Sequence, residues 1–309
     1  MNKKNVLTVK NLNKTYQKKG SNPVTAIENL NLSVKQGEIF GLLGPNGAGK
    51  TTFINILSGS VMKTSGFVEV WGFNLDKNPR QVRASIGIVA QDVNLDPFFT
   101  PESLLDLQAG LYGIKKKDRI TSKILNLVSL EKQAKSYARS LSGGMKRRLM
   151  VAKSLVHQPP IIILDEPTAG VDVELRQNLW KNVKTLNQEG VTIILTTHYL
   201  EEAEKMCDRI GILNKGNLVA LDTTQKLLEK IQIKKISIKV NNRVNINENK
   251  FKTLKIVSST NDEINLSYDK NELKIDQIIK LIEKNGARIL DLSTDDGDLE
   301  DVFLSLTKS

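Results

Sequence analysis

The strongest constraint on the fold is the segment 44–51, GPNGAGKT, which fits the pattern G-x-x-x-x-G-K-[ST]. It lies between an apolar run at Ile39–Leu43 and a helical pattern that begins at Lys50. In that setting glycines let the backbone curl so that successive N–H groups face phosphate oxygens, and the helix start adds its positive end. Lys50 would then bind the β- and γ-phosphates, and the hydroxyl of Thr51 would bind a Mg²⁺ ion. A glycine-rich turn with a surface lysine is the plainer alternative.

A pair of acids follows a second apolar run, Ile161–Leu164. Asp165 and Glu166 stand directly before Pro167, which ends the strand. Ligands of open α/β sheets bind at the carboxyl ends of the strands. Asp165 is therefore expected to hold Mg²⁺ through water, and Glu166 to orient and deprotonate an attacking water. An exposed acidic turn is the alternative, and the phosphate-binding pattern upstream argues against it.

Composition narrows the class of protein. Apolar residues make up 39% and charged residues 26% of the 309 residues, as in an ordinary globular chain. No apolar run approaches the ~18–20 residues that span a bilayer. The single cysteine, Cys207, excludes an internal disulfide and a CxxC metal site, so a reducing cytosol is expected. A net charge of +11 favours an anionic partner or a lysine-rich solvated surface.

The periodicity of the first part predicts an α/β fold. The first 90 residues are typical of strands and one helix, and residues 101–158 are mostly helical in pattern. Strands return at Ile161–Leu164 and Val191–Thr196 with a helix between them. A strand–helix–strand unit of this length indicates a parallel sheet.

Composition shifts near residue 222. Residues 223–234 have the pattern of a linking helix. From about Lys235 the expected order is strand, strand, helix, strand, helix, which predicts a small α+β domain over residues 235–309. This domain contains no catalytic constellation.

A third motif, Leu141-Ser142-Gly143-Gly144-Met145, opens a helix. A serine followed by glycines at a helix start offers a hydroxyl and bare N–H groups to an anion. One chain would then have two phosphate-binding surfaces, and a single nucleotide could use both only if they came from different subunits. A plain N-cap is the alternative.

Together these motifs resemble the ATP-binding cassette (ABC) family, the motor subunits of ABC transporters, over about residues 5–220. The resemblance implies an α/β P-loop NTPase cassette over residues 1–222, with a mixed sheet core, an antiparallel β part and a helical subdomain at about 92–152. A linker at 223–234 and the small α+β domain would follow. The resemblance implies these nucleotide-binding residues: Tyr16, Gly44, Pro45, Asn46, Gly47, Ala48, Gly49, Lys50, Thr51, Thr52, Ser142, Gly143, Gly144 and Asp172.

The resemblance also assigns catalytic and metal roles. Glu166, His198 and Gln91 would be catalytic, and Thr51, Gln91 and Asp165 would hold Mg²⁺. Tyr16 would stack on adenine, His198 would contact the γ-phosphate, and Asp172 would lie in the loop that meets the opposite P-loop. Each has a structural alternative: a strand aromatic for Tyr16, a polar strand end for Gln91, a satisfied histidine for His198 and a helix N-cap for Asp172.

Two departures point to a subgroup of the family. The fifth residue of the third motif is Met145, where the family most often has glutamine, and residues 169–172 are AGVD, where SALD is commoner. Both variants, and the small C-terminal domain, resemble the single-cassette exporters. That domain would be regulatory or dimer-stabilising.

The expected function is therefore an ATPase subunit with ATP and Mg²⁺ as cofactors. Two copies, or this cassette and a paired one, would sandwich two ATP molecules and energise export through a separate integral membrane permease. The subunit would lie in the cytoplasm on the inner face of the cell membrane, with no nucleic acid partner. The alternatives are a soluble ABC-type ATPase that acts on nucleic acid and a small-molecule P-loop kinase. The motifs do not name the cargo.

Overall fold

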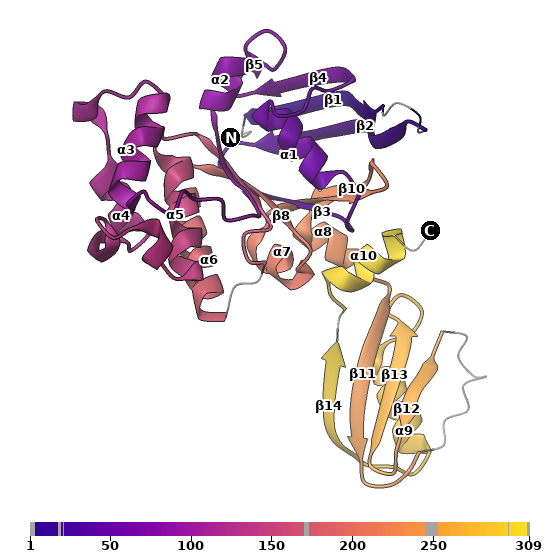
Figure 1. Cartoon of the computed structure of the whole chain (residues 1–309). Helices are drawn as coiled ribbons and strands as arrows, with labels where there is room; N and C mark the ends of the chain where they lie inside the picture. The colour runs from indigo at the N-terminus through magenta and orange to yellow at the C-terminus, as the bar shows by residue number, and fades with distance from the viewer. Residues whose placement is uncertain are drawn as a thin grey trace. The chain divides into compact units, whose positions relative to one another are not determined.

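The computed structural model describes residues 4–17, 20, 22–169, 173–244, 253–295 and 297–307 (Figure 1). The chain divides into two compact units, Met1–Thr223 and Thr224–Ser309. The expected boundary was residue 222, next to this division. Within the described ranges every helix is too short or too polar to cross a membrane.

A six-stranded sheet forms the centre of the first unit. Its order is β10-β9-β3-β8-β7-β6, and all neighbours are parallel except β10, which is antiparallel to β9. Every residue of β3, β7 and β8 is buried, which explains their continuous apolar runs. The strands are β3 (Ile39–Leu43), β6 (Ile86–Val89), β7 (Ile161–Asp165), β8 (Thr192–Thr197), β9 (Arg209–Asn214) and β10 (Asn217–Thr223).

An antiparallel sheet of order β2-β1-β4-β5 shares its core with this centre. Its strands are β1 (Asn5–Tyr16), β2 (Val24–Lys35), β4 (Ser65–Val70) and β5 (Phe73–Asn74), and α1 (Lys50–Ser58) packs with them. One buried cluster contains Leu12 of β1, Val34 of β2, Phe53 of α1 and Phe40 and Ile163 of the central sheet. Burial of these side chains, each worth about 1.5–3 kcal/mol, holds the two sheets together.

Helices α3, α4 and α5 gather beside the central sheet (Figure 1). The α5 N-cap is Ser142, whose Oγ accepts a hydrogen bond from the N–H of Met145 at 3.3 Å. The helices and 3₁₀ turns of this segment are α3 (Pro101–Leu111), η1 (Lys116–Asp118), α4 (Thr121–Leu127), η2 (Glu131–Gln133), η3 (Ala138–Ser140) and α5 (Gly143–Leu155). Two further helices, α6 (Val173–Gln188) and α7 (Leu200–Met206), flank β8 in sequence.

One helix of the first unit was not expected. The sequence predicted a single helix within the first 90 residues, whereas α2 (Pro79–Ala84) forms a second one. It has six residues and one buried side chain, Val82, so it presents no apolar repeat that periodicity could detect.

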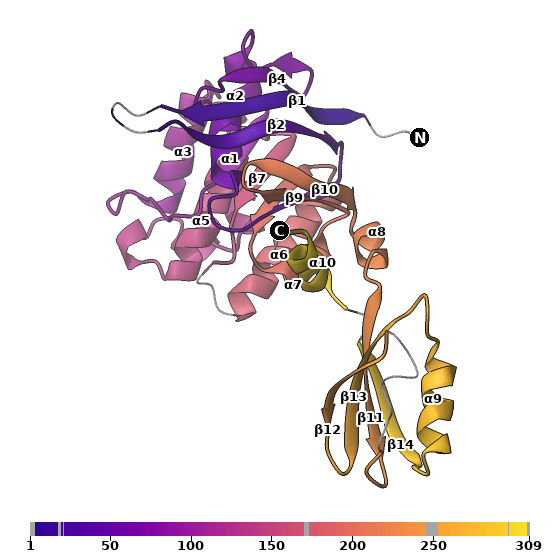
Figure 2. The same cartoon turned by 90° about the vertical axis from the view of Figure 1, so that its right-hand side faces the viewer.

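The second unit is a four-stranded antiparallel sheet of order β12-β13-β11-β14, with α9 packed on one face (Figure 2). Three strands, not the expected two, precede α9, because β12 has no buried residue and its pattern is weak. The helix expected over 223–234 ends at Glu229. The elements are α8 (Thr224–Glu229), β11 (Ile233–Val240), β12 (Lys255–Ser259), β13 (Glu263–Asp269), α9 (Ile275–Lys284), β14 (Ile289–Asp295) and α10 (Leu299–Thr307).

Candidate functional site

The loop between β3 and α1 is built so that only glycine fits at two positions. A Cβ on Gly44 would lie 2.5 Å from the carbonyl oxygen of Leu213, and one on Gly49 would lie 2.5 Å from that of Ala26. Gly47 and Gly49 also have positive φ angles, 80° and 108°. The glycines of the motif therefore let the backbone pass close to its neighbours and curl around a ligand.

The turn between β9 and β10 braces this loop. The N–H of Gly216 donates to the carbonyl of Ala48 at 3.1 Å, and the carbonyl of Gly216 accepts from the N–H of Glu28 at 2.9 Å. The loop is thus tied through Gly216 to both sheets, which gives a phosphate-binding backbone a fixed shape.

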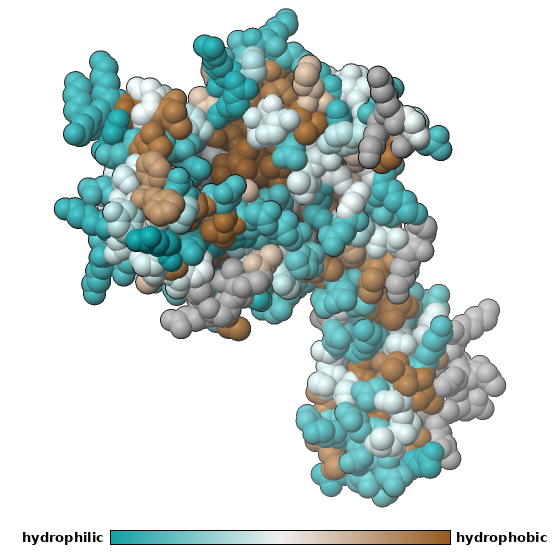
Figure 3. Space-filling model, in the orientation of Figure 1, coloured by the Kyte–Doolittle hydropathy of each residue, from teal (hydrophilic) through white to brown (hydrophobic). Residues whose placement is uncertain are grey.

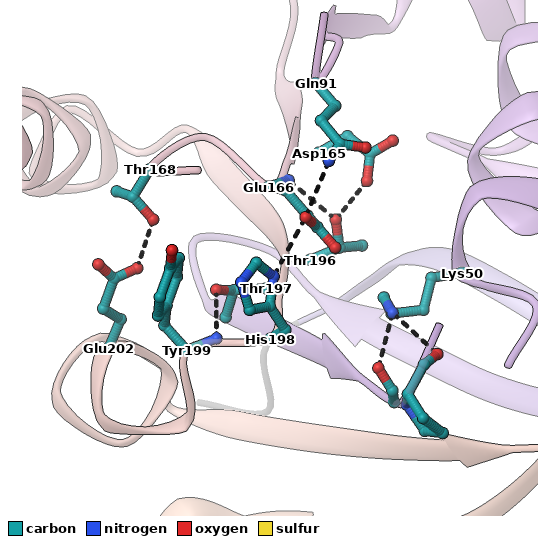
Figure 4. A network of polar contacts seen from close by, with 12 residues as sticks. Lys50, Gln91, Asp165, Glu166, Thr168, Thr196, Thr197, His198, Tyr199 and Glu202 are labelled. Atoms are coloured by element: carbon teal, nitrogen blue, oxygen red, sulfur yellow. Dashed lines mark hydrogen bonds and ion pairs between the residues drawn. The ribbon is translucent and has the colours of Figure 1, made fainter. Parts of the chain in front are cut away.

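Lys50 is buried at the start of α1, with 6% of its surface exposed. Its Nζ donates to the carbonyl oxygens of Gly44 at 2.6 Å and Pro45 at 3.2 Å (Figure 4). Burial lowers the pKa of Lys50, and the charges of Glu166 and Asp165 oppose that shift. Since an ammonium has three hydrogens, two bonds to the loop leave one for a phosphate oxygen.

Asp165 ends β7 and is held by the next strand. The hydroxyl of Thr196 donates to Asp165 Oδ1 at 2.5 Å, and Asp165 is 7% exposed. Burial raises the pKa of Asp165; the hydrogen bond from Thr196 and the charge of Lys50 oppose this, whereas the neighbouring charge of Glu166 adds to it. A cation beside this carboxylate would offset the cost of burying its charge.

Glu166 is the point on which three strand ends converge. Its Oε2 accepts from Gln91 Nε2 at 3.0 Å and lies 3.1 Å from His198 Nδ1 (Figure 4). A carboxylate only accepts, so Nδ1 of His198 carries the hydrogen. Glu166 is 8% exposed and has a positive φ of 46°. Such a conformation costs a non-glycine residue about 1–3 kcal/mol and occurs mostly at functional sites.

Lys50, Gln91, Glu166 and His198 line a cavity of about 690 Å³, within the range of ligand sites, and Asp165 does not line it. Ser142, Gly143 and Gly144 are not among its lining residues. The lining residues are Ala26, Asn46, Gly47, Ala48, Gly49, Lys50, Thr51, Thr52, Gln91, Glu166, Ala169 and His198.

Tyr16 lies at the end of β1 next to α1. Its hydroxyl is 3.5 Å from Oγ1 of Thr52, and its ring is 39% exposed. The Nζ of Lys14 lies 4.5 Å from the ring centroid. Tyr16 is thus placed beside the phosphate-binding loop with exposed ring surface on which a flat base could stack.

The remaining expected residues lie elsewhere. Ser142 caps α5, so the plain N-cap role is present, and Ser142 and Gly143 are both exposed. An exposed helix start with a hydroxyl can serve as a cap and an anion site together. Asp172 lies outside the described residues, as do Gly170 and Val171.

Arg147 is a site residue that the sequence analysis missed. It is 6% exposed, and its guanidinium donates to four backbone carbonyls around the site. Its position could have been found, because it precedes the buried Met150, Val151 and Ser154 by three, four and seven residues. A charged residue on the apolar stripe of a helix must find polar partners inside the protein.

The model of the ABC transporter family matches residues 27–169. The linearmycin resistance ATP-binding protein LnrL of Bacillus subtilis is 34% identical over 315 residues, which cover 98% of each chain. The Nod factor export ATP-binding protein I of Rhizobium etli is 34% identical over 302 residues, covering 96% of this chain and 91% of that one.

Solved structures agree with these relatives. An ATP-binding subunit of an ABC transporter superimposes with a TM-score of 0.65 at 29% identity, covering 73% of this chain and 92% of that one. A dimeric ATP-binding cassette in a post-hydrolysis state, bound to ADP and Pi, superimposes with a TM-score of 0.63 at 28% identity, covering 71% and 98%.

Proposed function

This chain belongs to the ABC transporter family as an ATP-binding, ATP-hydrolysing subunit, and we propose that it powers export through a separate membrane permease. The observation that carries the proposal is the convergence of Gln91 and His198 on one oxygen of Glu166, in the cavity that Lys50 also lines. Such an arrangement would sense the terminal phosphate of ATP, with Glu166 as a base beside it.

The proposal gives a role to the phosphate-binding loop, to Lys50, and to Glu166 with its two hydrogen-bond donors. The loop N–H groups and Lys50 bind the phosphates of ATP. Glu166 accepts a proton from the attacking water, and the hydrogen bonds from Gln91 and His198 hold its carboxylate in position.

Mg²⁺ fits the donor set of the site. Thr51, Gln91 and Asp165 would hold it with a hydroxyl, an amide and a carboxylate oxygen. No group of three or more His, Cys, Asp or Glu side chains suited to a metal occurs within the described ranges. Mg²⁺ is commonly held by one or two carboxylates and substrate phosphates, so the set is consistent with Mg²⁺ bound together with ATP. When bound, the ion would neutralise charge on the phosphates.

The dimer is proposed as head-to-tail. Ser142, Gly143 and Gly144 do not line the cavity of their own chain, and Ser142 and Gly143 are exposed. In a two-fold dimer they would close the partner's cavity over its ATP. Asp172 would lie in the same interface. Hydrolysis removes the phosphate that both chains bind, and the copies separate.

The permease is proposed to dock on the helical segment. Apolar atoms gather over α3 on the face shown in Figure 3. A monomer has no reason to expose this many large apolar side chains on one segment. The exposed ones in residues 92–152 are Val93, Phe98, Leu107, Leu111, Tyr112 and Tyr137. The subunit would then lie in the cytoplasm on the inner face of the membrane. One relative is named for the export of Nod factors, which supports an export role.

The dimer is tested with Glu166→Gln, which keeps the shape of the side chain and removes the base. With ATP and Mg²⁺, light scattering after gel filtration should show a dimer for Glu166→Gln. The matched control is the double variant Lys50→Met/Glu166→Gln, which should stay monomeric because it lacks the phosphate ligand. A monomeric Glu166→Gln that still binds ATP would overturn the sandwich.

The permease is tested by capture of the tagged chain from detergent-solubilised membranes of its own cell. A stoichiometric multi-span membrane protein is the expected companion. Leu111→Glu should lose it, whereas Val257→Glu, which adds the same charge at an exposed position of the second unit, should keep it. Capture of ribosomes or nucleic acid without a permease would instead favour a soluble ATPase.

A further inference from the structure

Arg147 joins two backbone segments behind the candidate site. Its Nη1 donates to the carbonyls of Ala90 at 3.0 Å and Gln91 at 2.5 Å. Its Nη2 donates to the carbonyl of Glu166 at 2.7 Å, and its Nε to that of Pro167 at 2.9 Å. One planar group therefore fixes the spacing between the segment 90–91 and the segment 166–167.

The same two segments meet again on the cavity side. The side chain of Gln91 donates to the side chain of Glu166 at 3.0 Å. Their backbones are bound by Arg147, and their side chains are bound to each other. A change in the distance between Gln91 and Glu166 must therefore displace Arg147 or break charge-assisted hydrogen bonds.

Arginine suits this position because its five N–H donors lie in one rigid plane and point in fixed directions. Four hydrogen bonds from its three nitrogens use that geometry. Lysine would offer a single nitrogen with three hydrogens on a flexible chain, so it could not serve both segments in the same way.

Arg147 also belongs to the helix that begins at Ser142. Arg147 lies five positions after Ser142, a rise of about 7.5 Å along the helix. Ser142 is bound to that helix through the N–H of Met145. The first turns of α5 thus join Arg147 to Ser142 as one short rigid element.

We infer that Arg147 is a positioning residue that transmits the spacing of Gln91 and Glu166 to Ser142, and so couples the two ATP sites of the dimer. This inference rests on the head-to-tail dimer proposed above, in which Ser142 contacts the ATP of the partner. Loss of the terminal phosphate in one cavity then alters the contact that the same chain makes with the other ATP. The coupling is reciprocal between the sites.

The neighbouring Arg148 provides a matched control. It lies on the same helix, but its Nη1 donates to the carbonyls of Val128 at 2.8 Å and Ser129 at 2.9 Å, within the helical segment. Arg148→Gln therefore removes a guanidinium of the same helix without touching the segments around Gln91 and Glu166.

The test compares Arg147→Gln and Arg148→Gln, each alone and in the Glu166→Gln background, using the full chain with ATP and Mg²⁺. Arg147→Gln should lower kcat at least tenfold and bring the Hill coefficient for ATP from above 1 to about 1, while ATP affinity at low protein concentration changes less than twofold. In the Glu166→Gln background it should weaken the ATP-dependent dimer at least tenfold. Arg148→Gln should change each quantity less than twofold, and Arg147→Lys should recover part of the kcat.

Three outcomes separate the possibilities. An Arg147→Gln chain with the Hill coefficient and dimer affinity of its parent would overturn the role of Arg147. An equal loss in Arg148→Gln would also overturn it, because general packing of α5 would then explain both. A monomeric Glu166→Gln would overturn the proposed dimer itself, before Arg147 is changed. Arg147→Lys keeps the charge, so it provides a folded variant if Arg147→Gln unfolds.

Discussion

Replacing Thr196 with valine removes the hydroxyl that holds Asp165 and that also accepts from the N–H of Glu166 at 3.2 Å. Thr196→Val keeps the branched shape in a fully buried strand position and keeps the backbone carbonyl that accepts from the N–H of Glu166 at 3.0 Å. It removes the hydroxyl that donates to Asp165 Oδ1 at 2.5 Å. A hydrogen bond to a charged group contributes about 1.5–3 kcal/mol, and one between neutral groups about 0.5–1.5 kcal/mol.

The free energy of unfolding that Thr196→Val loses should depend on pH in a definite direction. Burial raises the pKa of Asp165 above its unfolded value, so its charged form costs stability as the pH rises through the folded pKa. The hydrogen bond from Thr196 opposes that shift, so Thr196→Val raises the pKa further. The free energy of unfolding should therefore fall by about 1.5–3 kcal/mol at the alkaline end, pH 8, which favours the charged form of Asp165. It should fall by only about 0.5–1.5 kcal/mol as the pH approaches 4.

The assay is urea unfolding without nucleotide or Mg²⁺, followed by tryptophan fluorescence. The chain has two tryptophans, Trp71 and Trp180, and both belong to the first unit, so the signal reports that unit alone. The control is Thr197→Val, since the buried Thr197 hydroxyl accepts from the N–H of Tyr199 at 2.9 Å and does not contact a carboxylate within the described chain. It should cost about 0.5–1.5 kcal/mol at every pH. A loss in Thr196→Val that is equal at both pH values, or no larger than in Thr197→Val, would refute the reasoning.

Three further predictions concern other parts of the first unit. Gly49→Ala should abolish ATP binding in calorimetry and lower the melting temperature, because its Cβ would meet the carbonyl of Ala26 at 2.5 Å and φ is 108°; wild-type affinity would contradict the loop geometry. Tyr16→Ala should weaken ATP binding by about 1–3 kcal/mol and Tyr16→Phe much less, if the ring stacks on the base; equal losses would point to the hydroxyl. Burial lowers the pKa of His157, so the unfolded state takes up a proton first and stability falls as the pH drops below about 6.5. His157→Phe should flatten that fall in urea titrations, and an unchanged slope would count against this origin.

The positions of the site residues at the strand ends were predictable, because each of these residues follows an apolar run. Glu166 and His198 come directly after buried strands, and Gln91 comes two residues after one, so parallel order alone brings them to one edge. The contact among their side chains depends on rotamers, and no sequence pattern encodes a distance. The role of Arg147 was missed for a similar reason, since its four acceptors are backbone carbonyls from two distant segments.

The elements that the sequence analysis missed are the ones that bury least. Helix α2 buries only Val82, and β12 buries no residue, so neither has the apolar repeat on which prediction depends. Both take their form from contacts with neighbouring elements: β12 pairs with β13 through a register that begins at Lys255 and Ser267. Contacts with other elements determine where such helices and strands form, and the spacing of apolar residues along the sequence does not reveal those contacts.

The pairing of β3 determines when a newly made chain can first bind nucleotide. Both neighbours of β3 come from far downstream, β8 at Thr192–Thr197 and β9 at Arg209–Asn214, and the loop after β3 is braced by Gly216. A ribosome adding about 5–20 residues per second needs on the order of 10–30 s to proceed from the phosphate-binding motif to that brace. Throughout this interval the nascent chain carries the complete motif without the strands that shape it. Nucleotide can therefore stabilise this cassette only late in its synthesis, and a chain halted before residue 192 would carry a binding motif that binds nothing.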